Sequence, residues 1–303
     1  MKRNLTLDAL KILLSFFVVG LHGSMMTEVD PTLGFTLKQG LFRVAVPTFL
    51  IISGYYYYNI KSLQSEAKFI WRLFLLYLIW FVFYIPIFHP GPIDSSLINT
   101  FFSGYGHLWY LIHTMYALLL LSLIKRIPLE FQITIISLCA VAGLLLQYHF
   151  AYDLLPIDVE KTYSTHRNGI TFCLPFLYIG FIINKFEVRR ISWFYILPAL
   201  AFLLLESFLN HDAGKKSFDI LIALYVFCPV LFLVAIHSTK STHHKEISLI
   251  SGSIYLIHPF FLKYLHLKFL ELTQTELTLS AFFLSFFLSF TIIGIHRHFK
   301  YIL

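Results

Sequence analysis

The chain has 303 residues, of which 58% are hydrophobic, 18% aromatic and 13% charged, and its mean hydropathy is +0.75. The charged fraction is about half that of soluble globular domains, which excludes a water-soluble protein. The net charge of +7 does not indicate nucleic-acid binding, because the basic residues are scattered between apolar runs, as is typical of membrane proteins. We therefore expect a lipid bilayer, and no nucleic acid, among the partners.

Cysteine usage and the N-terminus give two further expectations. Cys139, Cys173 and Cys228 lie in apolar runs without a CxxC or CxxH spacing, so neither a disulfide framework nor a metal site is expected. The apolar stretch after the first residues is similar to a secretory signal, but Asp8 and Lys11 interrupt it. We predict a retained first helix.

Hydropathy predicts an all-α, polytopic membrane protein with about ten transmembrane helices. The expected spans are 7–26, 41–59, 69–88, 107–124, 131–150, 170–184, 191–208, 218–237, 247–268 and 277–296. Ten spans use roughly 200 residues, since each needs about 20. We therefore expect a single transmembrane domain over residues 1–303, with no appended soluble domain.

The positive-inside rule orients these helices. One set of alternate loops and helix ends carries 14 Lys and Arg residues, and the other set carries 8. Both termini are therefore predicted to be cytoplasmic. No internal repeat is visible, which makes a transporter built from inverted repeats less favoured.

Four polar residues share one face of the first helix. Asp8, Lys11, Ser15 and His22 are separated by 3, 4 and 7 residues, which fit the helical period. An ionisable side chain inside a span costs roughly 2.5–3.5 kcal/mol, so this face predicts a functional site. His22 would lie about 16 Å from Lys11, towards the outer membrane face. Alternatively, Asp8 and Lys11 form an interfacial pair and His22 only bonds a neighbouring helix.

Other polar residues lie near the predicted outer ends of the helices. Considered alone, Arg43 and Arg167 are explained equally well by a functional role and by a side chain that extends to the membrane surface. Together with His22 they would form a cationic pocket suited to a polarised carbonyl and a hydroxyl nucleophile. Trp109 belongs either to an aromatic belt at the membrane interface or to a sugar site. These outer residues are Arg43, His107, His113, Arg167 and His258.

Five segments in order resemble the acyltransferase-3 family of polytopic bacterial membrane acyltransferases. They are Leu7-Asp8-Ala9-Leu10-Lys11 with His22, Arg43 to Tyr55 around Ile52-Ser53-Gly54, Gly106-His107-Leu108-Trp109-Tyr110-Leu111, Arg167-Asn168-Gly169 leading to Pro175 to Gly180, and Ser253 to Pro259. The resemblance covers essentially the whole chain. Lys11 stands where the family usually has Arg, which keeps the charge but loses the planar fork. His22, Arg43 and His258 match family positions.

The resemblance implies transfer of an acyl group, most often acetyl from acetyl-CoA, to a hydroxyl of a cell-envelope carbohydrate at the bacterial inner membrane. It implies that His22 is a general base or acyl carrier, with Arg43 or Arg167 stabilising the oxyanion. The donor would follow Asp8, Lys11 and Ser15, and the acceptor would contact His107, Trp109 and His258. No permanently bound cofactor is expected. Some family members carry a hydrolase-like or racemase domain, and we expect neither here. Basic residues on the cytoplasmic side would attract the donor: Lys61, Lys68, Arg72, Lys125, Arg126 and Arg190.

Three alternatives remain open from the sequence. The enzyme could use another donor, such as succinyl-CoA. The protein could instead export polysaccharide through its polar interior, in which case loss of His22 would be tolerated. It could also be a membrane scaffold, for which no specific feature was found. The acceptor sugar and the oligomeric state do not follow from the sequence.

Overall fold

A computed structural model describes residues 3–89, 91, 94–154, 163–215, 217–244 and 246–303 of the chain. Lys2, Lys161, Lys216 and Lys245, which contribute to the orientation argument, lie outside these residues. The chain forms two compact units. The first comprises Met1–Phe49 and Arg189–Leu303, and the second comprises Leu50–Val188.

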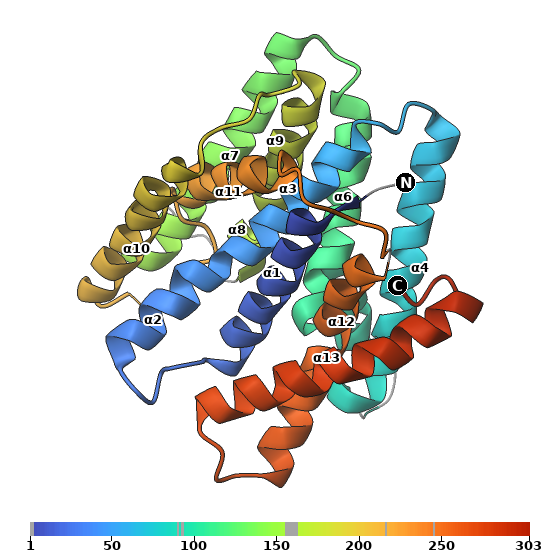
Figure 1. Cartoon of the computed structure of the whole chain (residues 1–303). Helices are drawn as coiled ribbons and strands as arrows, with labels where there is room; N and C mark the ends of the chain where they lie inside the picture. Colours follow the sequence, from blue (N-terminus) through green and yellow to red (C-terminus); the bar gives the residue numbers. More distant parts are fainter. Residues whose placement is uncertain (1–2, 90, 92–93, 155–162, 216, 245) are drawn as a thin grey trace. The chain divides into compact units, whose positions relative to one another are not determined.

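The first unit is built around α1, α12 and α13, which pack against one another (Figure 1). Their buried apolar side chains, including Val19, Ile254 and Ala281, form one core. The elements of this unit are β1 (Arg3–Asn4), α1 (Leu5–Gly23), α2 (Pro31–Gln39), the 3-10 helix η1 (Leu41–Val44), the start of α3 (Ala45–Tyr57), the 3-10 helix η4 (Trp193–Tyr195), α10 (Ile196–Asp212), α11 (Leu224–Ile236), β2 (Ser241–Thr242), α12 (Ile247–Lys268) and α13 (Gln274–His298).

Asn4 fixes the start of α1. Its side-chain oxygen accepts a hydrogen bond from the Leu7 amide at 2.9 Å, which caps the helix. Its amide nitrogen donates to the carbonyls of Ala235 and Ile236, at 2.9 and 2.8 Å. Because these carbonyls are at the end of α11, one side chain joins the beginning of one helix to the end of another. The short strands β1 and β2 pair antiparallel beside this junction.

Two segments of the first unit differ from the sequence prediction. Residues 31–39, expected in a loop, form α2, because Asp30 caps the helix by accepting from the Leu33 amide and Pro31 suits its first turn. Residues 218–223, expected in a span, are not helical, and α11 begins at Leu224. There the Glu206 carboxylate accepts from the amides of Ile222 and Ala223, at 2.9 and 2.7 Å.

The second unit holds the remaining helices. Its elements are the rest of α3, α4 (Leu63–Phe88), α5 (Ser95–Ser103), the 3-10 helix η2 (Gly106–Leu108), α6 (Trp109–Ile124), α7 (Leu129–Tyr152), α8 (Tyr163–His166), the π-helical turn η3 (Gly169–Cys173) and α9 (Leu174–Lys185). Asn168 caps η3 by accepting from the amides of Ile170 and Thr171, at 2.8 and 2.9 Å. A π-helical turn often marks a functional site in a helix.

Two glycines allow α3 and α9 to approach at backbone distance. A Cβ on Gly54 would lie 1.8 Å from the Leu177 carbonyl oxygen, and one on Gly180 would lie 1.9 Å from the Ile51 carbonyl oxygen. Asn184 joins the same helices by donating to the Tyr55 carbonyl at 2.7 Å. Small residues at such crossings are typical of transmembrane helix pairs.

We predict that Gly54→Ala or Gly180→Ala lowers the free energy of unfolding by about 3 kcal/mol, the upper part of the usual overpacking range. The loss is large because each methyl group meets backbone atoms, which cannot rotate away. Gly294→Ala is the control, since its Cβ meets nothing within 4 Å. Denaturation in mixed micelles measures all three variants. Equal stability of Gly180→Ala and Gly294→Ala would contradict the close crossing.

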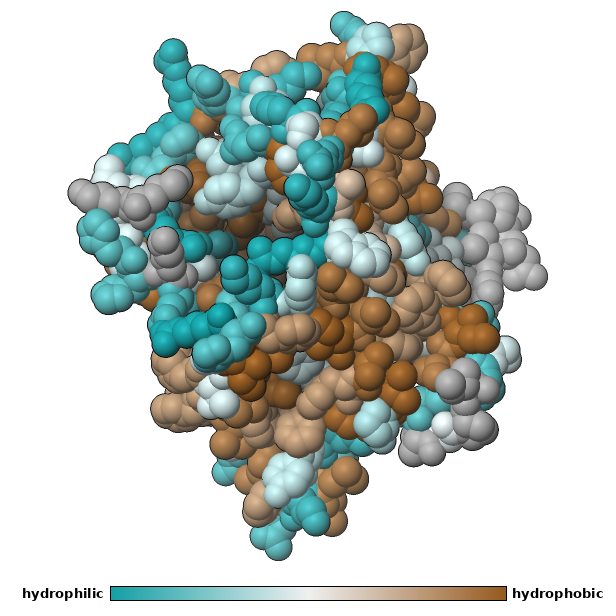
Figure 2. Space-filling view, turned by 90° about the vertical axis from the view of Figure 1, so that its right-hand side faces the viewer, coloured by the Kyte–Doolittle hydropathy of each residue, from teal (hydrophilic) through white to brown (hydrophobic). Residues whose placement is uncertain are grey.

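The described helices confirm an all-α, multi-pass membrane protein. Each of the ten predicted segments falls on a helix, and within the described residues seven helices are long and apolar enough to cross a membrane. One of the seven is the helical run Pro31–Tyr57, and two shorter apolar helices are Gly169–Lys185 and Leu224–Ile236. Figure 2 shows a face on which hydrophobic atoms predominate over wide areas, as lipid contact requires. The count of ten spans, the cytoplasmic termini and the single domain stay predictions.

Candidate active site

Asp8 lies between two cations at the start of α1. Its side chain is buried, and its carboxylate is 3.3 Å from Lys11 Nζ and 3.3 Å from Arg3 Nε. The spacing of three residues therefore brings Asp8 and Lys11 together as an ion pair. With Arg3 included, the group carries one net positive charge. Its assignment to donor binding stays a prediction.

Ser15, one helical turn beyond Lys11, joins α1 to α12. Its hydroxyl oxygen lies 3.0 Å from the Lys11 carbonyl oxygen and 3.0 Å from the Ser251 carbonyl oxygen. The hydroxyl proton is thus shared between its own helix and the neighbouring one. Ser15 is fully buried, so its face of α1 is a helix–helix contact at this level.

His22 and His258 lie side by side at the other end of α1. Their ring centroids are 5.3 Å apart. His22 is exposed on the surface of the chain, whereas His258, from the middle of α12, is fully buried. The structure therefore brings the predicted catalytic histidine beside a residue predicted to bind substrate.

The backbone of α12 fixes the tautomer of His258. Its Nδ1 is 2.7 Å from the Tyr255 carbonyl oxygen and 3.2 Å from the Ile254 carbonyl oxygen. A carbonyl oxygen only accepts hydrogen bonds, so Nδ1 carries the proton in the neutral ring. Nε2 then bears the lone pair and acts as a hydrogen-bond acceptor. In the His22–His258 pair, the His258 ring therefore has an assigned donor nitrogen, Nδ1, and an assigned acceptor nitrogen, Nε2.

Arg43 belongs to a buried polar network. Its guanidinium forms an ion pair with Asp219, and the side chains of the two residues are 11% and 3% exposed. Gln39 Oε1 accepts from Arg43 Nε at 3.1 Å and from Nη2 at 2.6 Å, and it also accepts from the Phe218 amide at 3.2 Å. Arg43 therefore holds the non-helical segment 218–223 in place. Its catalytic role stays a prediction.

Sequence reasoning missed Asp219. The residue falls inside the segment that was predicted as a continuous span, where no loop was expected. The available signal was an ionisable residue in an apolar run, the same signal that identified Asp8.

The second unit contains the other predicted residues. The Arg167 guanidinium carbon lies 4.9 Å from the Trp109 ring centroid and 5.0 Å from that of Tyr163, within cation–π distance. His107 is buried, and its ring packs edge-on against Tyr84 with 5.1 Å between centroids. Arg167 and Trp109 thus meet, and the outer pocket with His22 and Arg43 stays a prediction.

A cavity of about 510 Å³ lies in the same unit, along the middle of α6 and around η3. His113 and Asn168 contribute polar groups to a mainly apolar wall. Trp109 is adjacent to this wall, since its ring centroid is 6.0 Å from that of His113. The volume is within the range of ligand pockets, roughly 300–1,000 Å³.

The nine predicted site residues thus divide between the two units. Asp8, Lys11, Ser15, His22, Arg43 and His258 belong to the first, and His107, Trp109 and Arg167 belong to the second. Their assignment as one site stays a prediction. In the described part of the chain, no three His, Cys, Asp or Glu side chains are grouped to hold a metal ion.

Comparison with known proteins gives similar sequences and a family. The serine/alanine racemase of Enterococcus gallinarum is 26% identical in an alignment of 293 residues that covers 87% of this chain and 42% of that protein. Two amino-acid racemases of Enterococcus faecalis are 24% and 25% identical, over 86% and 80% of this chain and 41% and 37% of those proteins. The chain therefore spans about two fifths of the length of these relatives. No solved structure matches it.

The acyltransferase-3 family model, described as an acyltransferase domain, matches residues 4–297. The match includes α1 with its polar face, the Arg43 network, the Arg167–Trp109 contact and His258 on α12. The chain belongs to the acyltransferase-3 family.

Proposed function

We propose that the protein is an O-acetyltransferase of the bacterial inner membrane. It transfers an acetyl group from cytosolic acetyl-CoA to a hydroxyl of a cell-surface or lipid-linked polysaccharide, such as an O-antigen or exopolysaccharide. The observation that carries this proposal is the His22–His258 pair, with its ring centroids 5.3 Å apart and the tautomer of His258 fixed by α12. Acyl transfer to a hydroxyl needs a base for the hydroxyl proton, and imidazole serves that purpose near neutral pH.

Two routes use the same residues. In direct transfer, His22 takes the proton from the sugar hydroxyl as the oxygen attacks the thioester carbonyl. The carbon–sulfur bond then breaks, and the imidazolium returns the proton to the leaving thiolate. In the covalent route, a His22 nitrogen attacks the thioester carbonyl and releases the thiol of CoA. The sugar hydroxyl then takes the acetyl group from the imidazole.

His258 has a positioning role in either route. Its side chain is fully buried beside the exposed His22, so it would hold the His22 imidazole in place for the acceptor hydroxyl. Lys11 would contact the donor, since the Arg3–Asp8–Lys11 group keeps one positive charge. In the second unit, the Arg167–Trp109 contact supports a carbohydrate site, because an indole face packs on the apolar face of a sugar ring.

The names of the relatives do not change this proposal. The name racemase describes the whole of each relative, and this chain matches about two fifths of the length of each. The matched part overlaps most of the region of the family model, and that family transfers acyl groups. We therefore propose acyl transfer, and not racemisation, for this chain.

The donor is tested with purified protein in proteoliposomes. We expect labelled acetyl-CoA to release one equivalent of free CoA for each acetyl ester formed on a lipid-linked glycan extracted from the source membranes. Excess succinyl-CoA should compete weakly. Preferential transfer of succinyl groups would reassign the donor, and no transfer from either thioester would contradict the proposal.

A further inference from the structure

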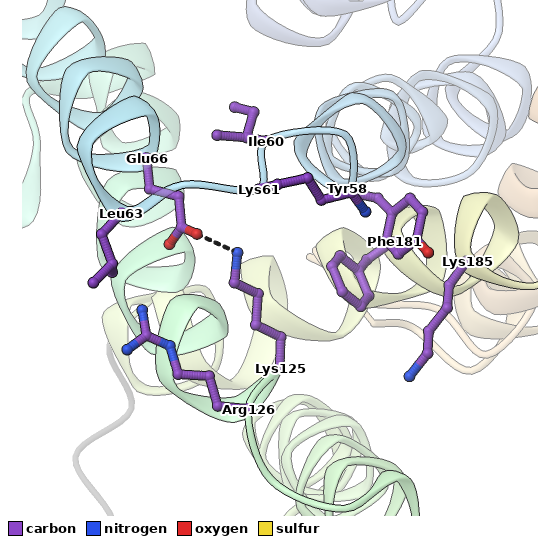
Figure 3. Close-up of a pocket in the computed structure, with 9 residues that line it drawn as sticks. All are labelled: Tyr58, Ile60, Lys61, Leu63, Glu66, Lys125, Arg126, Phe181 and Lys185. Atoms are coloured by element: carbon purple, nitrogen blue, oxygen red, sulfur yellow. Dashed lines mark hydrogen bonds and ion pairs between the residues drawn. The ribbon is translucent and has the colours of Figure 1, made fainter.

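A cationic cavity lies at the opposite end of α6 from Trp109. It has a volume of about 370 Å³ and belongs entirely to the second unit. Four chain segments form it, at the end of α3, the first turn of α4, the end of α6 and the end of α9. The lining residues are Tyr58, Ile60, Lys61, Leu63, Glu66, Lys125, Arg126, Phe181 and Lys185 (Figure 3). Because α6 has 16 residues, about 24 Å separates this cavity from the Arg167–Trp109 contact.

The floor of the cavity is electrically neutral. Glu66 is buried and forms an ion pair with Lys125, and Figure 3 shows the two side chains directed at each other. The Tyr57 hydroxyl donates to the same carboxylate at 3.1 Å. Glu66 is the only carboxylate among the described lining residues, and Lys125 already balances its charge.

The rim of the cavity carries an excess of positive charge. Lys61, Arg126 and Lys185 line it from three different segments, and no acidic residue among those described at the wall compensates them. The three cations lie at or just beyond the C-terminal ends of α3, α6 and α9. The negative ends of these helix dipoles therefore stabilise part of the positive charge. The helix ends do not explain why three cations surround one cavity, whereas a bound polyanion would form charge-assisted contacts with all three.

Aromatic rings complete the wall. The rings of Tyr58 and Phe181 meet edge-to-face with centroids 5.2 Å apart, and Lys61 Nζ lies 3.5 Å from the Tyr58 centroid. Aromatic faces stack on nucleobases, and cations bind the attached phosphates. A lipid headgroup would use the cations but leave the rings without a matching group. The combination favours a nucleotide.

We propose that this cavity binds the adenine nucleotide phosphates of the acyl-CoA donor. The assignment rests on the proposed function for the identity of the donor, but its geometry comes from the second unit alone. Lys61, Arg126 and Lys185 contact the phosphates, the Tyr58 ring contacts the adenine, and the Glu66–Lys125 pair shapes the floor.

The test measures binding of free coenzyme A and of adenosine 3′,5′-bisphosphate to purified protein in phosphatidylcholine nanodiscs. The variant is K61Q/R126Q/K185Q, which keeps the buried Glu66–Lys125 pair. The control is R189Q/K240Q/K300Q, which loses the same charge from exposed positions of the first unit. We expect the first variant to bind both probes at least about tenfold more weakly, because charge-assisted contacts are lost. The control variant should bind both probes within about threefold of the unmodified protein, since exposed charges are screened by salt.

Three results would overturn the assignment. If both triple variants weaken binding of the two probes equally, the binding comes from general electrostatic attraction and the cavity is not a nucleotide site. If neither nucleotide binds, but phosphatidylglycerol added to the nanodiscs associates with the protein in a way that depends on the three cations, the cavity binds a lipid headgroup. Acetyl transfer is measured on the same samples at saturating acetyl-CoA. Transfer that persists when the cavity variant binds coenzyme A normally would refute the cavity assignment and leave the proposed function intact.

Discussion

Replacement of His22 by alanine is expected to lower the rate of acetyl transfer at least about 100-fold, since general acid–base catalysis contributes typically 10²–10⁴-fold. The variant should insert and fold normally, because His22 is exposed and its removal opens no buried cavity. The matched control is His266→Ala, which removes an exposed imidazole from the last turn of α12. Its rate should equal that of the unmodified protein. Initial rates with labelled acetyl-CoA, at equal amounts of folded protein, provide the comparison.

Acid quenching during turnover separates the two chemical routes. If His22 carries the acetyl group, label will appear on the protein and will be absent from His22→Ala. Direct transfer leaves the protein unlabelled at every time point. A His22→Ala variant that retains the full rate would remove the histidine from both routes.

Breaking the Arg43–Asp219 pair is expected to destabilise the first unit by about 3–5 kcal/mol, because each single substitution leaves an uncompensated buried charge. The informative variants are Arg43→Met and Asp219→Leu. Both partners are largely buried, and Gln39 binds the same guanidinium. Because Gln39 also accepts from the Phe218 amide, the loss should extend to the segment 218–223. Unfolding in mixed micelles measures the change.

The double variant makes this prediction specific. R43M/D219L removes both charges, so its stability should exceed that of either single variant. The exposed pair Arg297–Glu246, with side chains 65% and 54% exposed, is the control, and removal of either partner should cost under about 1 kcal/mol. Additive losses at Arg43 and Asp219 would contradict the buried pair. A stable double variant without activity would assign Arg43 the catalytic role predicted from the sequence.

Hydropathy and helical spacing predicted much of the architecture. Every predicted span contains a helix, although residues 218–223 are not helical, because long apolar segments must satisfy their backbone groups internally in a bilayer. Spacing alone also paired Asp8 with Lys11, since residues three apart lie on one helix face. The spans and the ion pair both depend on residues close together in the sequence, so a local sequence pattern is sufficient to predict them.

Long-range contacts did not follow from the same patterns. Arg43 and Asp219 are 176 residues apart, and His22 and His258 belong to helices at opposite ends of the chain. The close approach at Gly54 and Gly180 depends on a crossing that hydropathy does not encode. The sequence predicted that Lys61, Lys125 and Arg126 would attract the donor, which stays a prediction, but it did not show that they share a cavity with Lys185.

Mass spectrometry of surface glycans, before and after mild alkali, tests the central claim most directly. The samples are cells that lack the gene, cells restored with it, and cells restored with His22→Ala at matched membrane levels. We predict an alkali-labile acetyl increment of mass only with the unmodified gene. Identical acetylation in all three, with a change in the amount of exported polymer, would contradict the account and identify a polysaccharide exporter.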